Sequence, residues 1–216
     1  MLSRLSTLAL AAACAFGALP ASASLITGHI AVDNSFALYT GNADGSGLTY
    51  IGRNTAHWDV TQTFNFSLAA GQYIYVAAWS DDAVAQGFIG QFDIDGTSTL
   101  LTNNTWEAHM TNIDIDDFFS FLPATSQVAA EIGENTWSPI THTLDNGAAP
   151  WGTRPGISTS ADWIWGSPLT PGSAEGEYQI FRHQVGTAAV PEPGTLGLMG
   201  LGLLGLVGAA RARKRK

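Results

Sequence analysis

The sequence predicts an all-β domain, folded as an antiparallel β-sandwich, between two apolar segments at the ends of the chain. Residues of high β propensity gather in short runs, as over residues 71–79, and apolar and polar side chains alternate over residues 60–68. Turn sequences rich in Gly, Asn, Asp or Ala separate these runs, at residues 42–47, 69–71, 95–96 and 146–147. Short strands at this spacing are typical of sandwiches.

Residues 1–23 have the three parts of a secretory signal peptide. Arg4 supplies a positive charge, residues 5–19 are apolar, and residues 21–23 have the small-x-small form after which signal peptidase cuts. We therefore expect signal peptidase to act on this chain and the mature protein to begin at Ser24. A lipoprotein signal at Cys14 is the alternative, and with cleavage after residue 23 the mature domain has no cysteine.

Residues 24–189 suit a single domain with its own core. Their patterns predict strands at residues 28–39, 60–68, 71–79, 87–94 and 177–185. Residues 114–121 and 126–132 are predicted to form short helices or helical turns. Residues 146–173, rich in Gly, Pro and Trp, are predicted to form a long ordered loop.

The domain is strongly acidic. Residues 24–189 contain three arginines, no lysine and 17 carboxylates, which gives a formal charge of −14. Such a surface repels the phosphates of nucleic acids and of anionic lipids, so we expect no nucleic-acid partner. Divalent cations and neutral sugars remain compatible with it, and solubility alone would also explain the charge.

Closely spaced carboxylates are candidate calcium ligands. Asp93 and Asp95 are separated by one residue, and so are Asp114 and Asp116. Calcium takes oxygen ligands, and extracellular sites can be weak, so Ca²⁺ is the cofactor that these residues would hold. Alternation along a strand would also place Asp93 and Asp95 together on a solvated face, with no ion.

The tryptophans divide into two groups. Trp151, Trp163 and Trp165 fall in the expected loop, where aromatic rings could stack on sugars, and they are the candidate glycan-binding residues. The alternative is that these rings pack the loop down. Trp79 and Trp106, flanked by strand sequence, are predicted to lie in the core.

The sequence gives little support for catalysis. It has no nucleophile elbow, no His-Glu-x-x-His, no lysine and no cysteine in the mature domain, and its five histidines are scattered. We expect a protein that is not an enzyme. An exported polysaccharide hydrolase that uses two of the carboxylates is the less favoured alternative.

The C-terminal segment, residues 190–216, has three parts. Pro191, Glu192 and Pro193 form an extended stretch that a protease could bind. Residues 194–210 are uncharged and apolar, which is just long enough for a single transmembrane helix. Five of the last six residues are Lys or Arg and would stay in the cytoplasm, which places the domain on the other side of the membrane.

This tail resembles the PEP-CTERM sorting signal. The resemblance implies that an exosortase-type protease acts near Pro191 to Pro193 while the precursor is anchored in the inner membrane. It also implies release to the cell surface or extracellular matrix of a Gram-negative bacterium that makes exopolysaccharide.

Residues 28–110 resemble the jelly-roll modules of the galactose-binding-like superfamily, through segments 32–39, 58, 64–79, 87–92 and 102–107. The resemblance implies a jelly-roll-like sandwich. Together these features predict an exported, non-enzymatic protein that associates with exopolysaccharide. The alternative is a calcium-stabilised structural domain without a glycan ligand.

Overall fold

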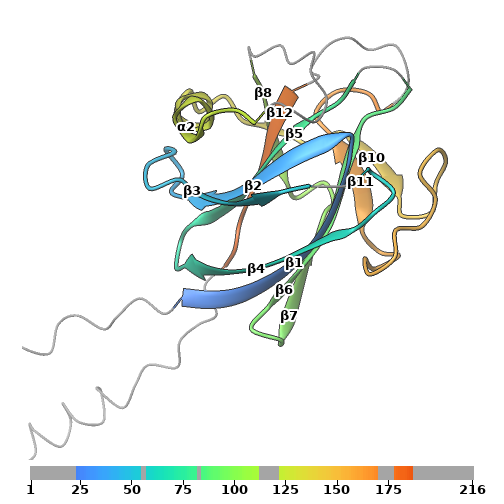
Figure 1. Ribbon diagram of the computed structural model, residues 1–216, viewed down its shortest axis with the longest axis horizontal. Helices are drawn as coiled ribbons and strands as arrows, with labels where there is room; N and C mark the ends of the chain where they lie inside the picture. The colour runs from blue at the N-terminus through green and yellow to red at the C-terminus, as the bar shows by residue number, and fades with distance from the viewer. Residues whose placement is uncertain (1–22, 55–56, 82–83, 112–121, 170–177, 187–216) are drawn as a thin grey trace, which may run out of the picture. The chain divides into compact units, whose positions relative to one another are not determined.

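Two antiparallel sheets pack face to face in the computed structural model (Figure 1). The structure describes residues 23–54, 57–81, 84–111, 122–169 and 178–186, which all fall in one compact unit. The first sheet has the order β10-β11-β6-β1-β4, with β7 also paired to β6. Its strands are β1 (Ala23–Asp33), β4 (Gln62–Ala69), β6 (Gly87–Ile94), β7 (Ser98–Leu101), β10 (His142–Asp145) and β11 (Asp162–Trp165).

The second sheet has the order β3-β2-β5-β12-β8-β9. Its strands are β2 (Ser35–Gly41), β3 (Thr49–Arg53), β5 (Tyr73–Trp79), β8 (Glu107–Met110), β9 (Ser138–Pro139) and β12 (Tyr178–Gln184). Helix α2 (Thr125–Gly133) lies outside this sheet (Figure 1). The predicted all-β sandwich is confirmed, and its two antiparallel sheets are consistent with a jelly roll.

The second sheet is buried on both faces at β2 and β5, which explains why these two strands carry mostly apolar and aromatic side chains. Leu38 of β2 and Val76 of β5 face the first sheet, in the larger apolar cluster. Their neighbours Tyr39 and Tyr75 face the other way and join a second cluster, with Val128 and other residues of α2. The helix therefore covers the outer face of this sheet.

The expected strand over residues 28–39 is wrong in one respect, because it is two strands in different sheets. The chain passes from β1 to β2 at Asn34, whose side-chain Oδ1 accepts a hydrogen bond from the Asp81 amide at 2.7 Å. Asn54 supports the same turn, since its Nδ2 donates to the Asn34 carbonyl and its Oδ1 accepts from the Phe36 amide. The buried side-chain amides of Asn34 and Asn54 thus form hydrogen bonds with backbone groups at the point where the chain leaves one sheet for the other.

The expected loop over residues 146–173 is also partly wrong, because it contains β11 (Asp162–Trp165). This strand is only four residues long and pairs with β10, also four residues long, so neither shows a clear alternation. The helix predicted at residues 126–132 is confirmed as α2. The helix predicted at residues 114–121 lies outside the described residues.

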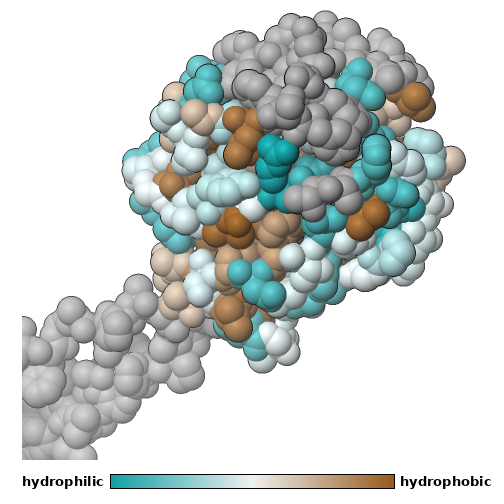
Figure 2. Space-filling model, viewed as in Figure 1, coloured by the Kyte–Doolittle hydropathy of each residue, from teal (hydrophilic) through white to brown (hydrophobic). Residues whose placement is uncertain are grey.

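Apart from Ala23, the expected signal peptide and the C-terminal sorting segment lie outside the described residues. β1 begins at Ala23, and Ser24, the expected first residue of the mature protein, pairs with Leu68 of β4. Among the described residues, no helix has the length and apolar character needed to span a membrane. The expected transmembrane segment, residues 194–210, lies outside the described residues. On the face drawn in Figure 2, apolar residues form separate areas between polar ones.

Candidate functional site

A pocket of about 260 Å³ lies beside the turn from β1 to β2. We call it the Asp33 pocket. Its walls come from four separate parts of the chain and consist of Asp33, Asn34, Trp58, Asp81, Val84, Ala85, Pro150 and Trp151. Asp81 and Val84 are exposed, whereas Asp33 is only 7% exposed. The pocket therefore has a polar inner wall and an accessible rim.

Hydrogen bonds to the backbone hold the inner wall in place. The Asn34 amide donates to the carbonyl of Trp79 at 3.0 Å, which ties the turn to the end of β5. Since Asn34 also accepts from the Asp81 amide, the start of the 81–85 segment is fixed against the same turn. Asp33 and Asp81 are thus held in place by the hydrogen bonds of Asn34, the residue at which the chain passes from the first sheet to the second.

Asp33 is the titratable group at the centre of the pocket. The indole Nε1 of Trp151 donates a hydrogen bond to its Oδ2 at 2.8 Å. The pKa of Asp33 is raised from 3.8 to about 6, chiefly by burial; the Trp151 hydrogen bond lowers it and the charge of Asp81 raises it, and both effects are included in that value. A carboxyl that titrates near neutral pH in a pocket is a property of functional sites.

Asp33→Asn is expected to stabilise the protein at neutral pH. A buried acid with a raised pKa contributes stability below its unfolded value of 3.8, and this contribution is lost as the pH rises through about 6. The two-unit shift corresponds to about 3 kcal/mol at most. The amide oxygen of asparagine can still accept from Trp151, so the hydrogen bond remains available.

Urea unfolding of both proteins at pH 4 and at pH 7.5 measures this effect, because other titrating groups cancel in the difference. The advantage of Asp33→Asn should be small at pH 4 and large at pH 7.5. If the difference in free energy of unfolding between the two proteins is the same at both pH values, ionisation of Asp33 does not destabilise the folded protein.

Trp58 forms an aromatic part of the pocket wall, and Arg154 lies over its ring. The guanidinium carbon of Arg154 lies 5.1 Å from the centre of the half-buried Trp58 ring, and its Nη2 donates to the Trp151 carbonyl at 2.6 Å. The Nε and Nη1 of Arg154 are buried without a hydrogen-bond partner among the described residues. An indole ring next to carboxylates can contact both the apolar face and the hydroxyl groups of a sugar.

The three tryptophans expected to bind glycan lie in the interior. Trp151 is 2% exposed, and Trp163 and Trp165 are 0% exposed. Trp151 stacks on Trp163 at 4.4 Å, and Trp165 packs against Phe181 at 5.2 Å. The structure therefore places these rings in the packing role, and only Trp151 lines the Asp33 pocket.

The two tryptophans predicted to lie in the core are confirmed there. Trp79 is 2% exposed and Trp106 is 0% exposed. Trp58, which does line the pocket, had no sequence signal that separated it from the other tryptophans.

The carboxylates expected to bind calcium have protein partners where they are described. Asp93 accepts hydrogen bonds from Thr99 at 2.9 Å and from Gln91 at 3.1 Å, and Asp95 accepts one from the Leu25 amide at 2.7 Å. Asp95 lies in the turn after β6, with a φ of 51°. Asp114 and Asp116 lie outside the described residues, so calcium binding there stays a prediction.

A different group among the described residues has the side chains of a metal site. His109, Glu131 and Glu134 have ligand atoms within 4.8 Å of one another. This group was not predicted from the sequence. The only signal was the spacing of the two glutamates at the end of the predicted helix, and nothing linked His109 to them.

The comparison with known families gives a match over the C-terminal segment of the chain. Residues 189–215 match the PEP-CTERM protein-sorting motif. No curated protein and no solved structure matches the chain significantly, so no galactose-binding-like relative is shown. The C-terminal segment carries the motif by which exosortase recognises exported proteins that are handled at the membrane.

Proposed function

We propose that this chain is an exported, non-enzymatic surface or matrix protein that associates with exopolysaccharide through the Asp33 pocket. The sorting motif at residues 189–215 supports export and removal of the tail. The observation that carries the ligand part of the proposal is the pocket itself, whose lining includes Trp58 together with Asp33 and Asp81.

The charge of the domain favours a neutral sugar. Residues 24–189 have a formal charge of −14, and the pocket itself contains Asp33 and Asp81, so an acidic sugar would be repelled. Sugar hydroxyls can donate hydrogen bonds to both carboxylates, and the less polar face of a pyranose can lie on Trp58. The volume is below the roughly 300–1,000 Å³ of drug-sized sites, which suits one sugar unit.

Trp58→Ala tests the proposal. The full chain, purified in detergent, is co-sedimented with exopolysaccharide from the producing cells, and the bound fraction is measured against polysaccharide concentration. We expect Trp58→Ala to weaken association about tenfold, because it removes the ring from the pocket. Trp58→Phe retains an aromatic face and should lose less.

Tyr50→Ala is the matched control, since Tyr50 is an exposed aromatic residue on β3 that does not line the pocket. Its association should equal that of the unmodified chain. Circular dichroism of each variant excludes unfolding as the cause. Equal association of Trp58→Ala and the unmodified chain would refute sugar binding by this pocket.

A hydrolase is the second candidate, favoured by one observation. Asp33 has a pKa of about 6, which is the property of a general acid, and Asp81 lines the same pocket. Release of reducing sugar from the same polysaccharide, lost in Asp81→Asn, would support the hydrolase and contradict the non-enzymatic proposal.

A further inference from the structure

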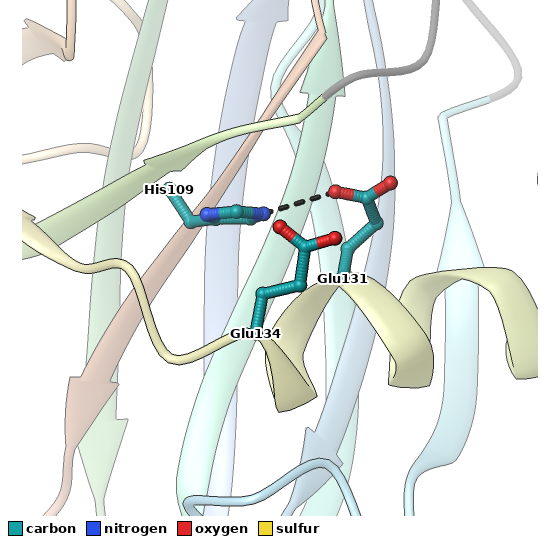
Figure 3. A group of neighbouring side chains, drawn as sticks. All are labelled: His109, Glu131 and Glu134. Carbon is teal, nitrogen blue, oxygen red and sulfur yellow. Dashed lines mark hydrogen bonds and ion pairs between the residues drawn. The ribbon is translucent and has the colours of Figure 1, made fainter.

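We propose that His109, Glu131 and Glu134 bind a divalent transition-metal ion of the zinc class, which fastens helix α2 to strand β8. His109 lies on β8, Glu131 is in the last turn of α2, and Glu134 is the residue that caps the helix. Figure 3 shows all three side chains directed toward a common point between the strand and the helix. This site is separate from the Asp33 pocket and does not depend on the proposed function.

The three ligand atoms need only a small movement to surround an ion. The Nε2 of His109 is 3.0 Å from an oxygen of Glu131, and all three ligand atoms lie within 4.8 Å of one another (Figure 3). A tetrahedral zinc ion with bonds of about 2.0–2.1 Å holds its ligand atoms about 3.3 Å apart. Glu134 is exposed, so its side chain can close the remaining distance at little cost in packing.

His109 is already oriented as a metal ligand. It is 1% exposed, and its Nδ1 is 2.7 Å from the hydroxyl of Thr136, while its Nε2 faces the carboxylates. A hydroxyl can donate or accept, so Thr136 can accept from Nδ1–H and leave Nε2 free for the ion. Metal-bound histidines usually have such a partner on the second ring nitrogen, and this partner fixes the ring and its tautomer.

The electrostatics of the helix end favour a cation. The C-terminus of a helix carries a partial negative charge, and here two carboxylates add to it. The last turn of α2 contains no basic residue. Arg182, on the neighbouring strand β12, is paired with Glu107 at 2.7 Å. A bound ion would therefore place positive charge between the two carboxylates at this end of the helix.

The ligand set indicates the kind of metal. An imidazole nitrogen favours zinc and related transition metals over calcium and magnesium, which take oxygen ligands. Two carboxylates complete three protein ligands and leave a further position for water. The ion would join β8 to α2 and so hold the helix on the outer face of the second sheet.

Metal titration of the full chain tests the site. The chain, purified in detergent without a polyhistidine tag, is freed of metal with EDTA, dialysed and titrated with Co²⁺ and then Zn²⁺. We expect visible cobalt absorption that saturates at a single equivalent and is displaced by Zn²⁺. Zn²⁺ should also raise the melting temperature in a concentration-dependent way, because it binds only the folded chain.

Variants decide which residues bind. Glu134→Gln should weaken Co²⁺ binding about tenfold or more, and Thr136→Val should weaken it about 10–100-fold by freeing the imidazole. Both residues are exposed, so both variants should fold. Asp59→Asn, which removes an exposed carboxylate elsewhere, should bind like the unmodified chain.

His109→Gln is the most direct variant, but it alters a buried residue, so Glu134→Gln decides the question if His109→Gln does not fold. Absence of cobalt absorption in the unmodified chain would overturn the proposal. So would equal cobalt affinity in Glu134→Gln and the unmodified chain. In either case the contact between His109 and Glu131 would be a hydrogen bond with a structural role only.

Discussion

Replacing Pro191, Glu192 and Pro193 by alanines is expected to abolish removal of the tail, so that full-length precursor accumulates in the membrane fraction. Residues 189–215 match the PEP-CTERM motif. Proline disfavours helix, and we expect the protease to recognise this first part of the motif as an extended segment. Alanines favour helix and remove the charge of Glu192. Intact mass of the protein in the membrane and extracellular fractions measures the effect.

Pro155→Ala is the matched control, because it removes an exposed proline outside the motif. The control should lose its tail as the unmodified chain does. If the triple-alanine variant still loses its tail, the protease does not read these three residues. If the unmodified chain keeps its tail, the protein works as a tail-anchored membrane protein, and its partners are at the membrane surface.

Trp106→Ala is expected to lower the free energy of unfolding by about 3–5 kcal/mol. The ring is 0% exposed, and it packs edge-on against Phe88 at 5.3 Å and near Phe92 at 5.6 Å. Its Nε1 also donates to the Leu101 carbonyl at 3.1 Å. A small domain has roughly 5–15 kcal/mol of stability in total, so this loss removes between a fifth and all of it.

Urea unfolding measures the loss, with Val84→Ala as the control. Val84 is 62% exposed, and a surface change of this kind should stay within about 0.5 kcal/mol. A loss below about 1 kcal/mol for Trp106→Ala would mean that the two sheets do not enclose this ring as the structure has it.

The strands that sequence could predict are those with a sustained local pattern. β4, β5, β6 and β12 fall within a few residues of their expected positions, because each is at least seven residues long and rich in β-formers. The break at Asn34 could not be predicted, since the pattern of residues 28–39 continues through it. What ends β1 there is a set of hydrogen bonds from Asn54 and Asp81, far along the chain.

The sites were harder to predict for the same reason. The Asp33 pocket joins residues from four separate segments, and no local pattern distinguishes Trp58 from Trp163. Burial is a property of the assembled sheets, so the sequence could name the aromatic residues but not separate the half-buried Trp58 ring from the fully buried ones. His109 likewise meets Glu131 only because β8 and α2 are neighbours in space.

Strand β12 joins the two halves of the second sheet. This strand is the last among the described residues, yet it lies between β5 and β8. Without residues 178–184 the second sheet would be two separate fragments, β3-β2-β5 and β8-β9, each with an unpaired edge. The strand that joins these fragments ends five residues before the sorting motif at residues 189–215, so the second sheet can close only when nearly all of the chain ahead of that motif is present.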